Sequence, residues 1–384
     1  MMRPCSLAAC LLFALAGAGL AACAGDRTPP SRQEILDGMA IPSEGDIVRG
    51  LRDGTGFVRS HRQAEALFPV LAREEFGQES LPEAGPFVAA VCPHDDHLYA
   101  GHVYLHAIAG IRAPRVLMVG VFHAARLWNL EGKLVFDRYV AWHSPLGPVR
   151  VDPLREELLG SLPPADVVVD DGMHDREHSL EAIVPFLQWY RGRDVTIVPV
   201  LVPYVTWDRL EELADRLADA LAGAIRRHGW RLGTDVAIVI SSDAVHYGPD
   251  FDHAPFGEDA AAHAKAVSRD RELAERYLAG PLAAGRLRGL FEQLVDPQDV
   301  RRYRIPWCGR FSVPFGLELT RRTAEKLGLP VPVGRVLRYG TSLTEAEPAV
   351  PRSVRDEGLG LTAPSNFHHF VGYLALGVEL PAGK

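Results

Sequence analysis

Five short runs of apolar residues stand out along the chain; all are rich in Val, and two also contain Ile. Within these runs the apolar residues do not alternate with polar ones, which is typical of strands that are covered on both faces of a sheet. We therefore predict five buried strands. The runs are FVAAVC (87–92), RVLMVGV (115–121), ADVVVD (165–170), VTIVPVLV (195–202) and DVAIVIS (235–241).

Between the predicted strands lie segments with a helical pattern: 104–111, 178–190 and 207–229. In the last of these, apolar residues from Leu210 to Ala224 fall on one face of a helix. Strands that alternate with helices indicate an α/β fold with a mainly parallel central sheet flanked by helices.

The first 22 residues have the layout of a secretory signal, with Arg3 followed by an uncharged apolar run that ends in small residues. This run is too short and too weakly flanked to be interpreted as a membrane-spanning helix. The junction LAAC (20–23) is similar to a bacterial lipobox, in which the cysteine is acylated and becomes the new N-terminus. We therefore predict lipidation at Cys23, and the alternative is an ordinary cleaved signal.

The resulting domain organisation has a lipoprotein signal peptide at 1–22, a tether at 23–45 and a single α/β domain at 46–384. We accordingly expect an exported protein anchored to the membrane through its N-terminal lipid, on the periplasmic or cell-surface side. The whole chain has 41 Lys and Arg against 49 Asp and Glu, a net charge of −8, and no basic clusters. This balance argues against a nucleic-acid partner.

Histidine and aspartate residues follow four of the predicted strands. In an open α/β sheet, ligands bind outside the carboxyl ends of the strands, so these residues are expected at one edge. A single histidine in such a position is usually a hydrogen-bonded structural residue, but four clusters on the same edge indicate a site. The segments are PHDDH (93–97), FHAAR (122–126), DGMHDREHS (171–179) and SDAVHYG (242–248).

Histidine, carboxylate and thiolate together are ligands that suit iron, zinc or copper rather than magnesium or calcium. One apparent metal motif is a poor candidate, however. Residues 174–178 fit the inverted zinc-peptidase pattern H-x-x-E-H, in which both histidines must lie well inside a helix. The upstream Asp170-Asp171-Gly172 favours a turn, and the helix is expected to begin near His178 and to be interrupted by Pro185.

Two cysteines remain for the folded domain, because Cys5 and Cys10 lie in the predicted signal and Cys23 is predicted to carry lipid. In an oxidising compartment, the default for Cys92 and Cys308 is a structural disulfide. Both lie beside candidate site residues, so a redox-gated site is a second hypothesis: metal is bound when Cys308 is reduced and is lost when Cys308 pairs with Cys92. The third interpretation is that Cys92 is a small buried residue at the end of a core strand.

Ordered segments across about residues 87–378 resemble the Memo family, also called component B of the AmmeMemoRadiSam system. Memo proteins share their fold with the class III extradiol dioxygenases, whose non-haem iron is held by two histidines and a carboxylate. The resemblance therefore implies a Memo-like α/β domain with a metal site. The matching segments are PHDDHLYAG, VLMVGVFH, WHSPLGPVRVD, HDREHSLEAIVPFLQ, ISSDAVHYG, WCGRFSVPFGLEL and FVGYLALGVEL.

The resemblance implies a role for six residues of this chain. His94, His123 and Cys308 match the metal ligands, and two imidazoles with a thiolate leave coordination positions open for a small molecule or dioxygen. Three further residues are implied to be catalytic: Asp243 and His246 line the same pocket, and His178 lies at its rim.

The chain also departs from the family pattern. Asp95, Asp96 and His97 replace the usual Ala-Gly-Tyr, which adds two charges and an extra candidate ligand to the pocket floor. Ala124 stands where many members have a second histidine. The family's usual N-terminal segment is not found in residues 47–70, so the resemblance is weaker before Phe87.

Three functions are compatible with these features. The first is an oxidoreductase that uses Fe²⁺, or alternatively copper or zinc, to act on a small molecule, with His246 or His178 moving protons. The second is a lipid-anchored iron or copper carrier or sensor without catalysis. The third is an interaction protein with a vestigial site, which the presence of all the site residues disfavours. The resemblance also implies a functional link to other AmmeMemoRadiSam components.

Overall fold

The structure is a computed structural model that describes residues 48–381. The predicted signal peptide, the lipidation site Cys23 and the predicted tether lie outside these residues. Within the described part of the chain, no helix is both long and apolar enough to cross a membrane.

A large sheet forms the centre of the domain, and a second, two-stranded sheet consists of β12 and β13. The strands are β1 (Val48–Arg49), β2 (Ala89–Cys92), β3 (Arg115–Val121), β4 (Leu134–Phe136), β5 (Ala141–Trp142), β6 (Val149–Val151), β7 (Val167–Val169), β8 (Thr196–Val202), β9 (Val236–Ser241), β10 (Asp243–Tyr247), β11 (Gly280–Pro281), β12 (Val295–Asp296), β13 (Asp299–Tyr303), β14 (Val333–Thr341) and β15 (Phe370–Glu379).

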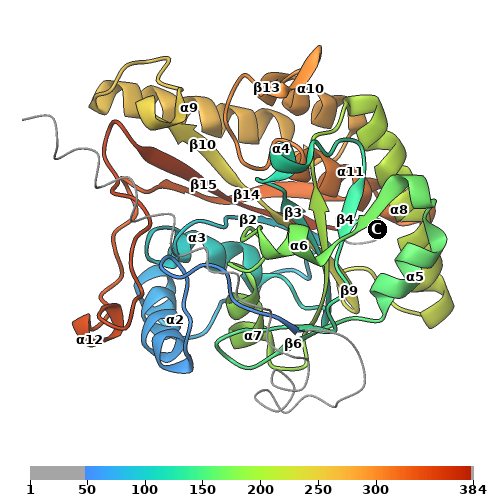
Figure 1. The fold of residues 1–384 in the computed structure, drawn as a ribbon, viewed down its shortest axis with the longest axis horizontal. Helices are drawn as coiled ribbons and strands as arrows, with labels where there is room; N and C mark the ends of the chain where they lie inside the picture. Colours follow the sequence, from blue (N-terminus) through green and yellow to red (C-terminus); the bar gives the residue numbers. More distant parts are fainter. Residues whose placement is uncertain (1–47, 382–384) are drawn as a thin grey trace, which may run out of the picture. The chain divides into compact units, whose positions relative to one another are not determined.

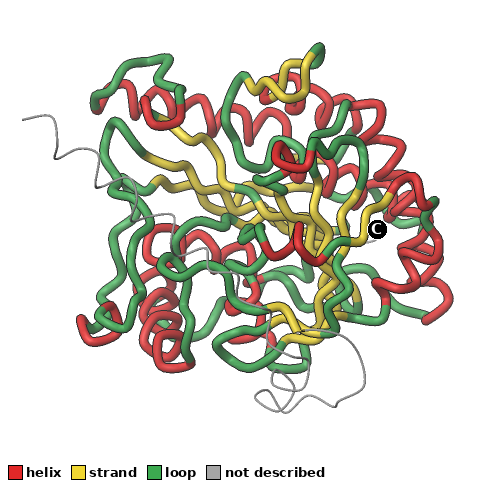
Figure 2. Tube along the Cα trace, in the orientation of Figure 1, coloured by secondary structure: helices red, strands yellow, loops and turns green. Residues whose placement is uncertain are grey.

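Helices lie on both sides of the central strands (Figure 2). The α-helices are α2 (His61–Phe76), α3 (His97–Ala109), α4 (Ala125–Trp128), α5 (Leu154–Ser161), α6 (Asp171–Asp175), α7 (Val184–Arg191), α8 (Trp207–His228), α9 (Ala260–Tyr277), α10 (Ala284–Leu294), α11 (Ser312–Lys326) and α12 (Arg352–Arg355). Two short 3-10 helices are η1 (Pro164–Asp166) and η2 (Pro249–Phe251).

The middle of the large sheet is parallel, as the sequence predicts. The strand order is β1-β5-β6-β8-β3-β9-β2-β15-β14-β11. From β6 to β2 every neighbouring pair is parallel, whereas β15 pairs antiparallel with β2, β14 and β10. The carboxyl ends of β3, β9 and β2 therefore meet at one edge, which is where the candidate site lies.

Two hydrophobic layers enclose the sheet. On one face pack α2, α3 and α7, and on the other face pack α5, α8, α10 and α11 (Figure 1). Successive residues of a central strand alternate between the layers: Leu117 and Val119 lie in one, whereas Val116 and Met118 lie in the other. The central strands are thus covered on both faces, which explains why their sequences are apolar without alternation.

All five predicted strands form, but their positions differ from expectation in one case. The run at 165–170 becomes β7, which pairs only with the short strand β4 and lies outside the ordered path of the main sheet. Its carboxyl end is therefore not part of the parallel edge that β2, β3 and β9 share. The five apolar runs also do not include β14 and β15, the long antiparallel strands that extend the sheet beyond β2.

The expectation for the segment around His178 is wrong. The helix near this residue begins at Val184, not at His178, and Pro185 lies in its first turn, where a proline is tolerated. Upstream, Asp171–Asp175 forms a short helix instead of an open turn, because the Asp170 side chain accepts a hydrogen bond from the backbone N–H of Met173 and caps it.

Candidate metal centre

Three strands of the parallel sheet bring their side chains to one place. His94 lies two residues after β2, and His123 lies two residues after β3. Asp243 and His246 follow β9 on β10, a strand that the sequence pattern did not predict. The sheet thus brings together residues that are up to 152 positions apart in the sequence.

Cys308 reaches the site from the loop before α11. The neighbouring Trp307 is fully buried, and its indole N–H donates to Oδ1 of Asp270 on α9 over 2.9 Å. The backbone N–H of His246 donates to the carbonyl of Pro306 over 3.1 Å. These contacts hold Cys308 beside β10, where its Sγ lies 3.5 Å from Nε2 of His246.

The hydrogen bonds of His94 set its tautomer. Its Nδ1 lies 2.7 Å from Oγ of Ser241, and this hydroxyl donates its single proton to the carbonyl of Ser179 over 2.7 Å. The hydroxyl must therefore accept from His94, so Nδ1 carries a proton and Nε2 is the ring nitrogen left to bind a metal. A hydrogen bond to the far ring nitrogen is how proteins orient metal-binding histidines.

The Nε2 atom of His94 is buried and makes no hydrogen bond of acceptable geometry within residues 48–381. It lies 3.2 Å from Oδ2 of Asp243, whose Oδ1 accepts from the backbone N–H of His94 over 2.9 Å. Burial raises the pKa of Asp243 to about 6, although His94 acts in the opposite direction. A buried nitrogen without a hydrogen bond, beside a carboxylate, fits a site that holds a cation.

His123 is oriented by Glu177, which the sequence analysis considered only as part of the zinc-peptidase pattern. The carboxylate of Glu177 accepts from the backbone N–H of His123 over 2.6 Å and lies 2.9 Å from its Nδ1. The other ring nitrogen, Nε2, lies 3.2 Å from Sγ of Cys308. Burial would raise the pKa of Glu177, but His123 and the hydrogen bonds hold it well below its ordinary value.

The cysteine has thiolate character in this setting. Burial would raise the pKa of Cys308, but His246 and His123 outweigh that effect and hold it well below the ordinary value. In return, the thiolate raises the pKa of His246 to about 9 despite the burial of the imidazole. The thiolate is the form of cysteine that binds metals.

His178 lies at the rim of this cluster, as the family resemblance implies. Its exposed ring stacks on that of His123 with 5.1 Å between centroids, and it lies 5.9 Å from the ring of His94. Although the ring reaches solvent, desolvation by the surrounding side chains and, after it, the neighbouring His123 lower the pKa of His178 below its ordinary value. The neutral imidazole is the form that accepts a proton or binds a metal.

Two groups of residues could hold a metal ion, and they share His94. One is His94, His123 and His178, and the other is His94, Asp243 and Cys308; within each group the ligand atoms all lie within 4.8 Å of one another. The three predicted ligands, His94, His123 and Cys308, are divided between these overlapping groups. The donors are imidazole, carboxylate and thiolate, and they fit iron, copper or zinc.

A buried arginine holds the turn that carries Glu177 and His178, and no sequence pattern indicated it. Arg49 on β1 pairs with Glu181 over 2.6 Å, and its guanidinium also donates to the carbonyls of His174 and Glu177. Its guanidinium lies 4.3 Å above the ring of Trp142. Because β7 does not belong to the parallel edge, it does not position Glu177 and His178 at the site. The contacts of Arg49 hold the turn that carries them instead.

Two residues singled out from the sequence lie elsewhere. His97 is fully buried, accepts from the backbone N–H of Val58 and donates to the carbonyl of Ala182, so it has a structural role and is not an extra ligand. His174 of the H-x-x-E-H pattern is also buried, with Nε2 3.2 Å from the carbonyl of Val135. The pattern does not form a peptidase site, because its two histidines do not share a helix.

Cys92 and Cys308 are both free thiols in the structure. Cys92 is fully buried in the layer that contains Leu98 and Tyr104, whereas Phe311, near Cys308, packs in the layer on the opposite face of the sheet. This arrangement favours a packing role for Cys92 over a disulfide with Cys308. The redox gate stays a prediction.

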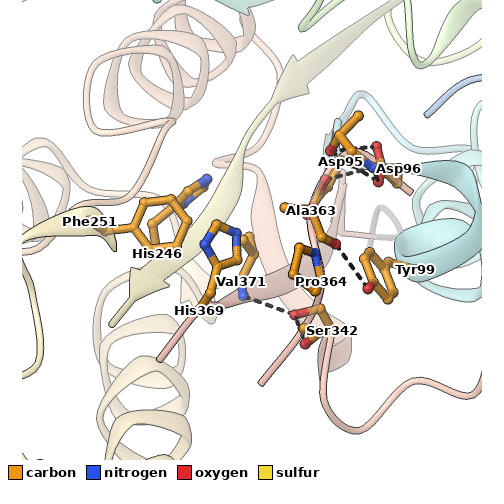
Figure 3. A pocket seen from close by; sticks show the side chains of 12 residues that line it. Asp95, Asp96, Tyr99, His246, Phe251, Ser342, Ala363, Pro364, His369 and Val371 are labelled. Atoms are coloured by element: carbon orange, nitrogen blue, oxygen red, sulfur yellow. Dashed lines mark hydrogen bonds between the residues drawn. The ribbon is translucent and has the colours of Figure 1, made fainter. Parts of the chain in front are cut away.

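Two openings flank the site. A groove of about 410 Å³ is lined by Cys308, His246, Phe251 and Arg310, among others. A smaller cavity of about 220 Å³ shares His246 and Phe251 with the groove and extends to Asp95 and Asp96 (Figure 3). Burial and the adjacent Asp95 raise the pKa of Asp96 to about 7, although hydrogen bonds from Thr362 oppose the rise.

Comparison with known families shows which family the chain belongs to. The model of a family described as "Memo-like protein" matches residues 62–349, which is three quarters of the chain. The chain belongs to the Memo family. The matched segment contains all six residues whose roles were inferred from the resemblance, and the mixed α/β architecture of this Memo-family chain is the one the resemblance implied.

Three curated relatives show how far the similarity of this Memo-family chain extends. A MEMO1 family protein of Saccharolobus islandicus is 27% identical over 264 residues, which cover 66% of this chain and 75% of the relative. A MEMO1 family protein of Aeropyrum pernix is 33% identical over 187 residues, 45% of this chain and 60% of the relative. A third, from Methanosarcina acetivorans, is 32% identical over 160 residues, 41% of this chain and 54% of the relative.

Proposed function

We propose that this Memo-family protein is a metal-dependent oxidoreductase that acts on a small molecule, with Fe²⁺ held by His94, His123 and Cys308. Copper and zinc are the alternative metals. One observation carries the proposal: the Cys308 sulfur lies 3.2 Å from Nε2 of His123, beside a His94 nitrogen that is buried without a hydrogen bond. A thiolate and two imidazoles are a donor set for a catalytic site with open positions.

In this proposal, bound iron supplies redox chemistry and open positions for a substrate and dioxygen. The chain's own residues orient the ligands and handle protons. Ser241 and Glu177 fix the rings of His94 and His123. His246, which lines both the groove and the cavity, and His178 at the rim are placed to donate or accept a substrate proton, and Asp243 fixes His94.

Metal content and oxygen consumption test this function. Protein purified from its own compartment is expected to contain iron by elemental analysis, and iron-loaded protein is expected to consume oxygen with at least one member of a panel of catechols. His123→Ala should lower metal affinity by one or more orders of magnitude, because it removes a coordinate bond. His228→Ala, which changes an exposed histidine on α8 away from the site, is the matched control.

The second candidate is a metal carrier or sensor without catalysis. Its support is the pair of overlapping ligand groups that share His94, because an ion could exchange ligands there without leaving the protein. A carrier should bind iron or copper in the same experiments and consume no oxygen with any catechol. An unchanged metal stoichiometry in a His94→Ala, His123→Ala double variant would contradict both the oxidoreductase and the carrier, because both need metal at this site.

We also propose that the protein is exported and held on the membrane by lipid at Cys23, and that it is linked in function to other AmmeMemoRadiSam components. The LAAC junction and family membership support these proposals. No nucleic-acid partner is proposed, since the chain carries a net charge of −8.

A further inference from the structure

The cavity beside the metal centre has a distinctive lining. On one side lie His246 and Phe251, which also border the groove that reaches Cys308, and on the other side lie Asp95 and Asp96 (Figure 3). A molecule in this cavity would therefore contact the proposed site at one end and two carboxyl groups at the other. The identity of such a molecule rests on the proposed function, because it would be the substrate of that same site.

The carboxyl groups have hydrogen-bond donors but no cationic partner. Asp96 is 2% exposed, and its oxygens accept from the backbone N–H and the hydroxyl of Thr362. Asp95 accepts from the hydroxyl of Tyr373 over 2.7 Å and from the backbone N–H of Asp96. No lysine or arginine lines the cavity, and no ion pair to Asp95 or Asp96 is formed within residues 48–381.

This arrangement is costly without a ligand. Two adjacent carboxyl groups repel one another when both are ionised, and burial withdraws water that would otherwise solvate them. Each carboxylate offers about four acceptor sites, so both retain capacity beyond the hydrogen bonds from Thr362, Tyr373 and the backbone. A cation placed between them would therefore relieve the repulsion and use the remaining acceptor sites.

The remaining side chains that line the cavity are mostly aromatic or apolar, and they favour a ligand with an apolar body. Phe251, Tyr99 and His369 present rings, and Val371 and Pro364 present apolar surface. The segment that closes the cavity is fixed by the hydroxyl of Tyr99, which donates to the carbonyl of Ala363 over 3.1 Å. A cavity of about 220 Å³ admits a small molecule and no folded peptide. Aromatic faces near a cation add further attraction.

We propose that the substrate of this site is a small aromatic or apolar amine that is protonated at neutral pH. Its ammonium group lies against Asp95 and Asp96, and its apolar body lies along Phe251 and Val371, with the reacting end toward His246. A carboxylate or phosphate ligand is disfavoured at this end, because it would face two acidic side chains.

Three probes of similar size and different charge test the proposal. Phenethylamine carries an ammonium, 2-phenylethanol is neutral and 3-phenylpropionate carries a carboxylate. Isothermal titration calorimetry at pH 7 on the mature protein should give an affinity for phenethylamine about tenfold to a hundredfold above that for 2-phenylethanol, with 3-phenylpropionate weakest. Equal affinity for the amine and the alcohol, strongest binding by the anion, or no binding by any probe would overturn the proposal.

Two variants test whether the aspartates cause the preference for phenethylamine over 2-phenylethanol. Asp95→Asn should reduce the affinity for phenethylamine to that for 2-phenylethanol and leave the alcohol's affinity unchanged. Asp252→Asn makes the same change of charge at an exposed carboxylate that lines the neighbouring groove, and it should keep the preference. If Asp252→Asn abolishes the preference as fully as Asp95→Asn, the cavity is not its origin. The wild-type probe series decides the proposal without any variant.

The same samples separate this inference from the proposed function. Metal content is measured by elemental analysis of each protein, and Asp95→Asn should keep its metal. A chain that binds metal but shows no preference for the amine overturns the inference alone. A chain that prefers the amine but contains no metal and consumes no oxygen overturns the proposed oxidoreductase alone.

Discussion

At the scale of single residues, one hydroxyl group determines how His94 can act. Ser241 lies at the end of β9 and is fully buried, and its hydroxyl links the carbonyl of Ser179 to the imidazole of His94. The hydroxyl therefore fixes both the proton on Nδ1 and the direction of the ring. The side chains that orient the proposed metal ligands thus matter as much to the candidate site as the ligands themselves.

Ser241→Ala should therefore weaken metal binding by about 10- to 100-fold, since it removes the hydrogen bond that orients His94. Ser312→Ala is the matched control: this serine is also buried and donates to the backbone carbonyl of Ser241, but it does not contact His94. Metal affinity is measured by competition with a chelator. Equal losses in the two variants would show that the effect comes from packing and not from the orientation of His94.

The candidate site residues could be picked out from the sequence more readily than the side chains that orient them. His94, His123 and Cys308 stand in short recognisable segments; the first two follow strands, and Cys308 precedes a helix. Glu177 and Ser241 were not assigned a supporting role, because a carboxylate or hydroxyl that acts through another side chain has no local pattern. Their partners are 54 and 147 positions away, and only the folded sheet brings them together.

At the scale of elements, α9 and β14 support the loop that carries Cys308 through one buried carboxyl group. Asp270 on α9 accepts from the indole N–H of Trp307, the hydroxyl of Tyr339 on β14 and the backbone N–H of Val245 on β10. Burial raises the pKa of Asp270 to about 6, although these hydrogen bonds act in the opposite direction. Folding therefore favours the protonated carboxyl group, and its contribution to stability should depend on pH.

The sign of this dependence is set by the raised pKa. Between about pH 4 and pH 6 the folded chain binds more protons at Asp270 than the unfolded chain, so its stability should fall as the pH rises through this window. The difference in unfolding free energy between wild type and Asp270→Asn should therefore change with pH. From about pH 4 to about pH 6, the wild type should lose about 1 to 3 kcal/mol relative to the variant. Denaturant unfolding of both proteins at several pH values measures this difference. A difference that does not change with pH would contradict the prediction.

The pattern of apolar residues predicted the parallel centre of the sheet because those strands are buried on both faces and therefore read as continuous apolar runs. It did not predict β14, in which Arg335 and Arg338 interrupt the apolar run and only Gly334 and the last three residues are buried. Nor did it predict that β7 would pair with β4, because strand order depends on contacts far apart in sequence. The element types were thus easier to predict than their partners.

At the scale of the whole molecule, the predicted lipid at Cys23 would attach the protein to the membrane. If Cys23 is acylated, mass spectrometry of the native N-terminus should find a lipid-modified cysteine as the first residue. More than one acyl chain is required for stable attachment, because a single chain gives only reversible membrane binding. An unmodified N-terminus at Ala24, or a chain that still contains Cys5, would contradict the prediction.

The antiparallel strand β15 has a consequence for where the folded unit begins and ends. The family match stops at residue 349, before β15, and begins at residue 62, after Arg49. A chain trimmed to the matched residues would lose the strand that pairs with Ala89, Ala90 and Val91, and β2 would become an open apolar edge. Such an edge invites pairing between molecules. A chain trimmed to the family boundaries is therefore expected to aggregate, although it keeps the three residues proposed as metal ligands.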